Sequence, residues 1–305
     1  MTTITLFGAP TDIGASTRGC SMGPEAIRIA DLAPALARTG FDVVDAGNVS
    51  GPLNPMQPPV NGLRHLDEVV AWNRSVFETS SRILGEGGLP VLLGGDHCLA
   101  IGSVSAAAAH CRRTGKRLVV LWLDAHADAN TGASTPTGNM HGMPVACLCG
   151  EGPDALTSLS GTRPAIRPDD IRQIGIRSVD PEEKLRLKAL GLTVFDMRFI
   201  DEYGMRHTME QALAGIGPDT HLHVSFDIDF IDSAIAPGVG TTVPGGPTYR
   251  ETQLCMEMIA DTGRLASVDV MELNPACDVR NETARLAVDF LESLFGKSTL
   301  IRPGR

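Results

Sequence analysis

Short apolar runs alternate along this chain with longer segments in which apolar residues recur at helical spacing. Several of the runs are apolar at almost every position, which is typical of strands buried on both faces of a sheet. We expect strands at Ile4–Phe7, Leu89–Leu93, Leu118–Leu123, Ile171–Ile176, Leu222–Phe226 and Leu265–Val270.

Four helices are marked by start and stop signals. A proline at the first turn and a glycine beyond the last turn bracket one helix, and Thr248 followed by Glu251 forms a capping-box pattern at the start of another. We expect helices over about Pro24–Ala37 and Leu66–Leu84, from about Thr248, and from about Asn281 to near Gly296.

This alternation of strands and helices predicts an α/β fold with three layers, in which helices cover both faces of a central, mostly parallel sheet. No internal repeat or linker divides the chain, so residues 1–305 are expected to form a single domain. Two segments rich in glycine and proline, Gly47–Gly62 and Asp232–Pro247, are expected to be loops within that domain.

Charge and composition argue against several classes of protein. The formal charge of −10 argues against a nucleic-acid partner. No stretch approaches the roughly 18 consecutive apolar residues of a membrane-spanning helix, and the first residues do not resemble a signal peptide. The seven cysteines form no CxxC pair, which argues against a zinc knuckle or a disulfide scaffold and favours a cytoplasmic location.

Histidines and carboxylates follow four of the predicted strands directly. Because ligand sites of parallel sheets lie beyond the carboxyl ends of the strands, these side chains are expected to meet at one edge. They are Asp96 and His97, then Asp124, His126 and Asp128, then Asp227 and Asp229, and finally Glu272.

The spacing of these residues points to metal ions. Residues at i, i+2 and i+4 of an extended segment share a face, so Asp124, His126 and Asp128 are expected to converge. So many carboxylates in one buried place require cations. Six donors are too many for one tetrahedral zinc but suit two octahedral ions, and oxygen and nitrogen donors without thiolate favour Mn²⁺ over Co²⁺, Ni²⁺, Fe²⁺ or Zn²⁺. Paired ions lower the pKa of a shared water.

A lone DxD motif at a strand end is more often a turn or a helix cap than a metal site. When DxHxD, a second DxD and GGDH occur together, as they do here, a chance occurrence of these motifs is a poor explanation, and a metal site is favoured. His221 and His223 alternate along a predicted strand too far from its end to bind an ion, and we expect them, like Trp122, to serve packing.

Several longer segments carry a resemblance to a known family. GGDHCLAIGS, LDAHADANTGASTPTGNMHG, SFDIDFIDSAIAPGVGTTVPGG and VMELNP resemble the signature segments of the arginase, or ureohydrolase, family. The opening and closing segments also resemble the bacterial arginases, so the similarity spans nearly the whole chain. Arginases, agmatinases and related hydrolases share these metal motifs, which therefore identify the superfamily better than the substrate.

The resemblance implies two Mn²⁺ ions and a bridging hydroxide that attacks a guanidinium carbon. It places one ion on His97, Asp124, Asp128 and Asp227, and the other on Asp124, His126, Asp227 and Asp229. It further implies that Asp128 accepts a hydrogen bond from the hydroxide, that His141 shuttles protons and that Glu272 binds the guanidinium group.

The same resemblance assigns residues to the rest of the substrate. Asn130 and Thr137 match positions that contact the α-carboxylate of arginine, Asp180 and Glu183 match those near its α-ammonium, and Thr241 matches a threonine near the guanidinium. The segment DPEE is also a typical helix start. Thr137 departs from the serine usual in arginases, and Cys98 departs from the serine usual after GGDH; we expect Cys98 to pack as a small apolar residue.

We therefore expect hydrolysis of L-arginine to L-ornithine and urea. An agmatinase or a guanidino-acid hydrolase is the alternative, and a catalytically silent metal-binding paralogue is a third hypothesis. Members of the resembled family usually form trimers or hexamers, so a homo-oligomer is expected.

Overall fold

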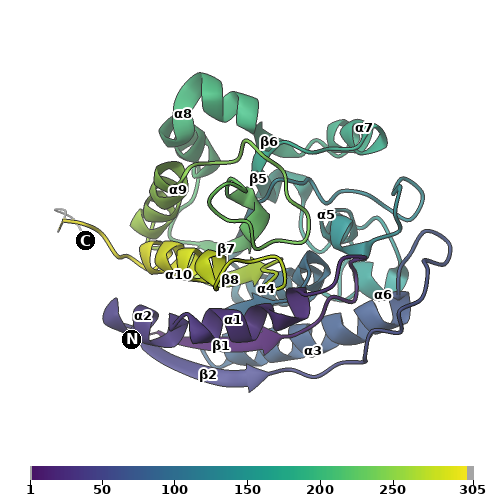
Figure 1. The fold of residues 1–305 in the computed structure, drawn as a ribbon, viewed down its shortest axis with the longest axis horizontal. Helices are drawn as coiled ribbons and strands as arrows, with labels where there is room; N and C mark the ends of the chain where they lie inside the picture. The colour runs from purple at the N-terminus through teal and green to yellow at the C-terminus, as the bar shows by residue number, and fades with distance from the viewer. Residues whose placement is uncertain (1, 301–305) are drawn as a thin grey trace.

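The eight strands within residues 2–300 form one sheet in which every neighbouring pair is parallel (Figure 1). The computed structural model describes residues 2–300. Across the sheet the order is β2-β1-β3-β8-β7-β4-β5-β6. The strands are β1 (Thr3–Ala9), β2 (Asp42–Asn48), β3 (Leu89–Gly94), β4 (Arg117–Leu123), β5 (Ile171–Ile176), β6 (Thr193–Asp196), β7 (Thr220–Asp227) and β8 (Leu265–Met271).

The predicted α/β class with a parallel sheet is confirmed, and all six predicted strands are present. Two strands were not predicted, and both are edges. β2 and β6 have partner strands on one side only, and most of their residues are exposed or half-buried. A strand that is not buried on both faces has no continuous apolar run, which is the pattern the prediction used.

Helices cover both faces of the sheet, as expected. On one face α1, α2, α8, α9 and α10 pack over the strands, and on the other α3, α4 and α5 do so. The helices are α1 (Gly23–Ile29), α2 (Leu32–Arg38), α3 (Leu66–Gly85), α4 (Ala100–Thr114), α5 (Pro144–Leu148), α6 (Asp154–Thr157), α7 (Pro181–Leu190), α8 (Met197–Ala212), α9 (Tyr249–Asp261) and α10 (Glu282–Leu294).

The helix predicted over Pro24–Ala37 is two helices. The chain breaks between α1 and α2 at Asp31, which has a φ of 64°. An aspartate tolerates this left-handed conformation better than most residues, but a helix cannot continue through it. Apolar spacing on both sides of the break gave no sign of it, because both pieces bury one side against the same sheet.

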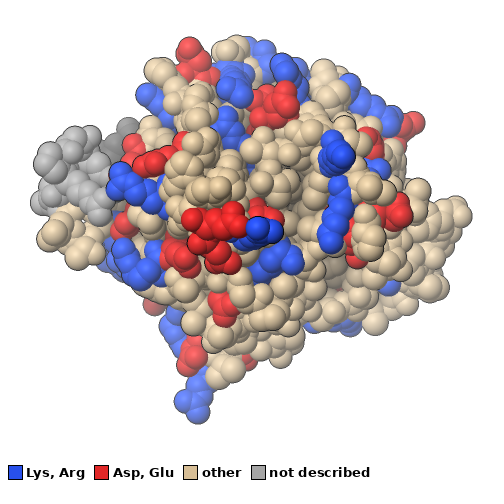
Figure 2. Space-filling view, turned by 90° about the horizontal axis from the view of Figure 1, so that it is seen from above, with Lys and Arg blue, Asp and Glu red and all other residues tan. Residues whose placement is uncertain are grey.

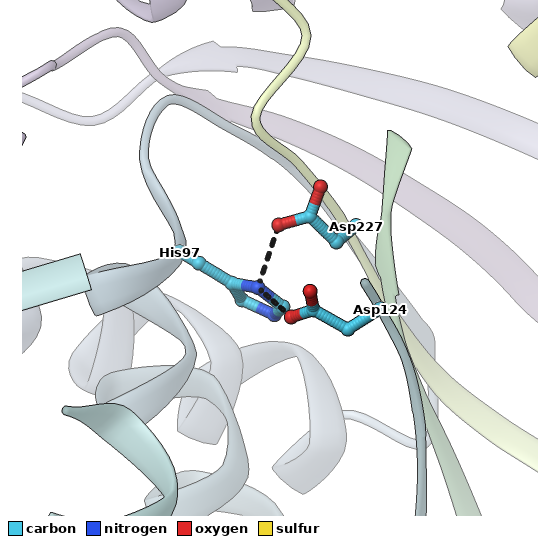
Figure 3. A group of neighbouring side chains, drawn as sticks. All are labelled: His97, Asp124 and Asp227. Carbon is cyan, nitrogen blue, oxygen red and sulfur yellow. Dashed lines mark hydrogen bonds and ion pairs between the residues drawn. The ribbon is translucent and has the colours of Figure 1, made fainter. Parts of the chain in front are cut away.

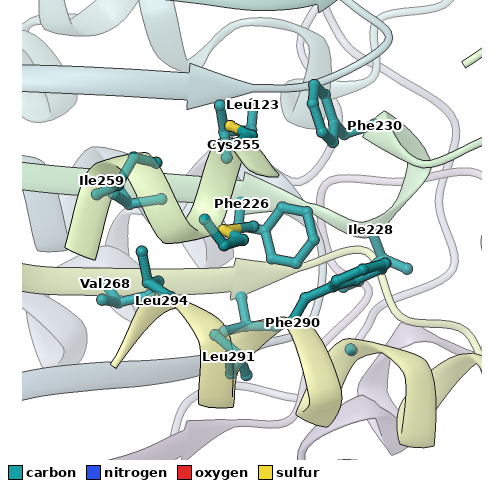
Figure 4. Packing of buried hydrophobic residues seen from close by; sticks show 14 of the residues in the cluster. Leu123, Phe226, Ile228, Phe230, Cys255, Ile259, Val268, Phe290, Leu291 and Leu294 are labelled. Atoms are coloured by element: carbon teal, nitrogen blue, oxygen red, sulfur yellow. The ribbon is translucent and has the colours of Figure 1, made fainter. Parts of the chain in front are cut away.

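The two central strands β7 and β8 separate apolar from polar side chains face by face. Their apolar residues, among them Phe226 and Val268, pack with Ile259, Phe290 and Leu291 of α9 and α10 (Figure 4). The intervening positions on the other face carry histidine, serine and aspartate, all buried. Alternation therefore places a polar layer in the middle of the sheet.

The capping box predicted at the start of α9 is present. The Thr248 hydroxyl accepts from the amide of Glu251, and the Glu251 side chain accepts from the amide of Thr248. Replacing Thr248 by alanine is expected to lower the free energy of unfolding by about 1 kcal/mol, because amides of the first turn lose their acceptor. Urea denaturation measures this change. Thr248→Ser, which keeps the hydroxyl, should stay near wild type, and equal losses in both variants would contradict the capping role.

Basic and acidic side chains are interspersed on the face drawn in Figure 2, with broad uncharged areas between them. Within residues 2–300, no helix combines the length and apolar character needed to cross a membrane.

Candidate metal centre and substrate cavity

The four central strands of the sheet, β3, β8, β7 and β4, end at the candidate site. At three of these ends an aspartate side chain accepts a hydrogen bond from the amide two residues later. Asp96 accepts from Cys98, Asp124 from His126 and Asp227 from Asp229. This turn is a local preference of aspartate. It engages one carboxylate oxygen of Asp124 and of Asp227 and holds each side chain in place at the end of its strand.

His97 points its Nδ1 atom at the carboxylates of Asp124 and Asp227 (Figure 3), and the Asp128 carboxylate lies close to the same atom. The distances are 3.0 Å to Asp227 Oδ2, 3.1 Å to Asp124 Oδ2 and 3.3 Å to Asp128 Oδ2. One ring nitrogen has one proton at most, so hydrogen bonding alone cannot satisfy three acceptors. The ring of Trp122 stacks on His97 with a centroid separation of 4.2 Å and fixes its plane.

A second group lies beside the first and shares Asp124 with it. His126 Nδ1 is 3.0 Å from Asp229 Oδ2 and 3.5 Å from Asp124 Oδ1. The amide of Ala125 donates to Asp229 Oδ1 over 3.1 Å, which ties the end of β7 to the end of β4. Donor atoms of His97, Asp124 and Asp227, and those of Asp124, His126 and Asp229, each gather closely enough to hold one ion.

The electrostatics show how unfavourable these groups are without a cation. Burial and the neighbouring carboxylates Asp229 and Asp124 raise the pKa of Asp227 well above its ordinary value. Burial would lower the pKa of His97, but Asp124 and the other carboxylates outweigh it and raise that pKa to about 9. Protons compete for positions that a divalent ion would neutralise better, so binding an ion releases protons.

The donor set fits two divalent ions. Such ions bind imidazole nitrogen and carboxylate oxygen at about 2.0–2.2 Å, which puts neighbouring ligands of an octahedron about 3 Å apart. The separations of 3.0–3.3 Å around His97 Nδ1 match this spacing. Among residues 2–300, no cysteine belongs to either donor group, and hard oxygen donors dominate.

Asp128 and Glu272 reach the site through strained backbone. Their φ angles are 52° and 63°, in the left-handed region that costs a residue with a Cβ atom about 1 kcal/mol or more. The expectation that Asp124, His126 and Asp128 converge along an extended segment is therefore wrong in its geometry. β4 ends at Leu123, and the turn at Asp128 brings its carboxylate back toward His97.

Glu272 lies deep in the site with both carboxylate oxygens engaged. Oε1 accepts from the amide of His97 over 2.8 Å and lies 3.0 Å from His141 Nδ1, and Cys20 Sγ lies 3.3 Å from Oε2. Burial alone would raise the pKa of Glu272, but His141 and the His97 amide hold that pKa below its ordinary value. Glu272 is therefore an anion at neutral pH.

A cavity of about 350 Å³ opens above these groups. Every residue that the sequence proposed for the site lines this cavity except Asp124, which is fully buried behind it. They are His97, His126, Asp128, Asn130, Thr137, His141, Asp180, Glu183, Asp227, Asp229, Thr241 and Glu272.

At the outer part of the cavity, Asp180 and Glu183 are also the start of α7, so the typical helix-start interpretation of DPEE is correct as well. Asp180 is the N-cap residue, and Glu183 completes its capping box. Glu183 Oε1 additionally accepts from the amide of Ala129, while Arg186 donates to the carbonyl of Ala129. Both backbone polar groups of Ala129 are thus held next to Asn130, whose side-chain amide donates to Asp180 Oδ2 over 3.1 Å.

Some residues of the site were not found from the sequence. Ser16, Asn139 and Ser178 also line the cavity, and isolated polar residues in loops give no signal. Trp122 was assigned to packing alone, yet its indole N–H donates to Asp124 Oδ2 over 2.9 Å. His221 and His223 are buried and contact Ser267 and Asp269, which lie outside the residues that line the cavity.

Comparison with known proteins agrees with this geometry. The profile described as "Arginase family" matches residues 2–296. An arginase from Agrobacterium fabrum is 44% identical over 303 residues, which are 98% of this chain and 93% of that protein. The native structure of the arginase from Bacillus caldovelox has a TM-score of 0.92 at 38% identity and covers 98% of this chain and 100% of that one. A proclavaminate amidino hydrolase from Streptomyces clavuligerus has a TM-score of 0.74 at 28% identity, covering 96% of this chain and 91% of its own. Full-length similarity at this level, together with paired histidine and aspartate groups at the strand ends, establishes that the chain belongs to the arginase family.

Proposed function

We propose that the protein hydrolyses the guanidinium group of L-arginine, giving L-ornithine and urea. One observation carries the proposal: two groups of metal donors and the anionic carboxylate of Glu272 line or adjoin a single cavity. A permanently charged guanidinium needs such a carboxylate partner. The full-length similarity to proteins named arginase supports the same reaction.

Two Mn²⁺ ions are the proposed cofactors, because oxygen donors with two imidazoles suit this ion. His97, Asp124, Asp128 and Asp227 would hold one ion, and Asp124, His126, Asp227 and Asp229 the other. Bound there, the pair would lower the pKa of a water molecule enough to make it a nucleophile at neutral pH.

The protein groups bind the guanidinium and move protons. Glu272 pairs with the guanidinium and orients its carbon toward the donor groups at the strand ends. Asp128, next to His97, accepts a proton from the attacking water and delivers it to the leaving amine. His141 lies 3.0 Å from Glu272 and is partly open to the cavity, so it is placed to exchange protons with solvent.

The outer residues are proposed to select arginine over guanidines without an α-carboxylate. Asn130 and Thr137 provide an amide and a hydroxyl for the α-carboxylate, and Asp180 and Glu183 provide negative charge for the α-ammonium. The contacts of Glu183 with Ala129 leave Asp180 as the more available anion of the two. Thr241 lines the same cavity and is proposed to contact the substrate near the guanidinium.

Removing the hydroxyl of Thr137 tests this selection. Thr137→Val is expected to raise the KM for arginine about tenfold to a hundredfold, because a hydrogen bond to a charged group contributes about 1.5–3 kcal/mol. The turnover of agmatine, which has no α-carboxylate, should change little. Thr137→Ser, the matched control, should behave like wild type. Equal losses with both substrates would show that Thr137 does not contact the α-carboxylate.

A urea-release assay tests the proposed reaction. The protein is stripped with a chelator, reloaded with Mn²⁺ and supplied with arginine, agmatine or guanidinobutyrate. We expect activity to disappear on chelation, to return with Mn²⁺ and to be highest with arginine. A higher kcat/KM for agmatine would favour the agmatinase alternative, and metal uptake without urea release from any substrate would favour the silent paralogue.

The remaining proposals concern organisation. We propose a single domain over residues 1–305, a cytoplasmic location and a homo-oligomer, a trimer or hexamer. Exposed apolar side chains, among them Ile29, Leu53 and Leu185, are compatible with burial between subunits. Light scattering coupled to size-exclusion chromatography measures the oligomer, and a monomer at micromolar concentration would contradict this proposal.

A further inference from the structure

The polar layer between α4 and the strands β7 and β8 forms one connected chain of hydrogen bonds. His221, His223 and Ser225 of β7 and Ser267 and Asp269 of β8 are each at most 3% exposed. Buried polar groups in the middle of a sheet destabilise the fold unless they are satisfied. Packing alone therefore does not explain why these positions are polar.

The chain begins at the candidate metal ligand His97. Its Nε2 atom lies 2.8 Å from Ser225 Oγ, and Ser225 Oγ lies 3.4 Å from Asp269 Oδ2. Ser103 of α4 also donates to Asp269 Oδ2, over 2.6 Å. Asp269 thus stands one residue removed from the ligand and contacts none of the atoms that would bind an ion.

A second branch of the hydrogen-bond chain reaches Asp269 through His223. His223 Nε2 lies 3.0 Å from Asp269 Oδ2, and His223 Nδ1 lies 2.7 Å from Ser267 Oγ. Ser267 Oγ lies 2.9 Å from His221 Nε2. A carboxylate only accepts, so His223 donates to Asp269 from Nε2, and Ser267 Oγ links its Nδ1 atom to His221.

The directions of these bonds decide the tautomer of His97. Ser225 has a single hydroxyl proton, and Asp269 accepts it. Ser225 Oγ can then only accept from His97, so Nε2 keeps its proton, and the neutral ring that binds an ion has its lone pair on Nδ1. Without Asp269, the Ser225 hydroxyl is free to donate to Nε2, and the proton moves to Nδ1, where it would block an ion.

We propose that Asp269 is a positioning residue of the metal centre, acting through Ser225 to hold a proton on the Nε2 atom of His97, so that Nδ1, which faces Asp124 and Asp227, is the atom that gives up its proton to an ion. The stack on Trp122 already fixes the plane of the ring, which leaves its tautomer as the property that Asp269 controls. This inference rests on the proposed metal centre and does not depend on which guanidino compound is hydrolysed.

The test compares Mn²⁺ binding by calorimetry, and metal content per chain, in wild type, Asp269→Ala, Ser225→Ala and the double variant. Each single variant is expected to lower the affinity for one of the two Mn²⁺ ions about tenfold to a hundredfold. This is the usual effect of losing a group that orients a metal ligand. The double variant should be no weaker than either single one, since Asp269 acts only through Ser225. Additive losses, or wild-type affinity in either single variant, would overturn the proposal.

Ser267→Ala is the matched control. It removes a hydroxyl from the same buried layer but leaves the contacts of Asp269 with Ser225 and Ser103 in place. We expect Mn²⁺ affinity within about twofold of wild type, together with a lower melting temperature of the metal-free protein. A loss of affinity as large as that of Asp269→Ala would show a general effect of the layer and would contradict the specific role. If Asp269→Ala does not fold, the pair Ser225→Ala and Ser267→Ala decides the matter alone.

The nitrogen that holds the proton can also be observed directly. Long-range ¹H–¹⁵N spectra of the metal-free protein, recorded above the His97 pKa of about 9, distinguish the two tautomers of its neutral imidazole. We expect the Nε2–H form of His97 in wild type and in Ser267→Ala, and a shift toward the Nδ1–H form in Asp269→Ala. A wild type that binds both ions but releases no urea would refute the proposed function and leave this comparison intact.

Discussion

Asp124→Asn is expected to reduce urea release from arginine by about a thousandfold or more. Asp124 belongs to both groups of metal donors, and its oxygens also accept from the Trp122 indole and the His126 amide. An amide cannot donate charge to two cations, so both ions lose a ligand at once. Metal ions in such sites contribute several kcal/mol to catalysis, and each 1.36 kcal/mol is a factor of ten in rate.

The measurement pairs kcat/KM at saturating Mn²⁺ with the metal content of the isolated variant. We expect fewer than two ions per chain. The matched control is Asp170→Asn, which removes a carboxylate paired with Arg117 at the amino ends of β4 and β5, away from the site. It should retain nearly full activity and two ions. An Asp124→Asn variant with wild-type turnover would refute the two-ion centre.

The strands at the centre of the sheet were predictable because a strand buried on both faces is apolar at almost every position. β3, β4 and β7 are almost entirely buried, and their apolar runs stand out from the helical segments. Parallel strands then place their carboxyl ends together, so side chains distant in sequence could be assigned to one site without coordinates. The donors that fulfil this expectation, His97 and Asp227 for example, lie about 3 Å apart.

Features that depend on tertiary contacts were not predictable in the same way. β2 pairs in register with β1 although most of its side chains are exposed. Backbone hydrogen bonds hold it there, so the spacing of apolar residues does not reveal it. The break at Asp31 and the left-handed residues Asp128 and Glu272 are likewise backbone properties. Nothing in residue type alone distinguishes these positions from ordinary aspartates and glutamates.

The polar layer under the site shows a third limit. The alternation in THLHVSFD and LASVDVM is visible in the sequence, and it predicts that His223, Ser225 and Asp269 face one side. Alternation normally means that the polar side faces water. Here that side faces α4 and is fully buried, which only the packing of the helix reveals.

Glu272→Gln is expected to lower kcat/KM for arginine about a hundredfold to a thousandfold while two metal ions remain bound. The glutamine keeps an oxygen that can accept from the His97 amide, as Oε1 does over 2.8 Å, so the backbone near the ion is preserved. What it loses is the negative charge opposite a permanently charged guanidinium. Breaking a buried charge pair costs about 3–5 kcal/mol, and 1.36 kcal/mol corresponds to a factor of ten.

Steady-state kinetics with arginine and agmatine, together with metal analysis, checks this expectation. Both substrates have the guanidinium, so both should lose activity by similar factors, which separates Glu272 from Thr137 at the other end of the cavity. Glu210→Gln, which removes an exposed carboxylate paired with Arg206 on α8, provides the matched control and should leave the kinetics unchanged. Loss of a metal ion from Glu272→Gln would instead mean that Glu272 supports the ions through His97, and the guanidinium would then need another anionic partner in the cavity.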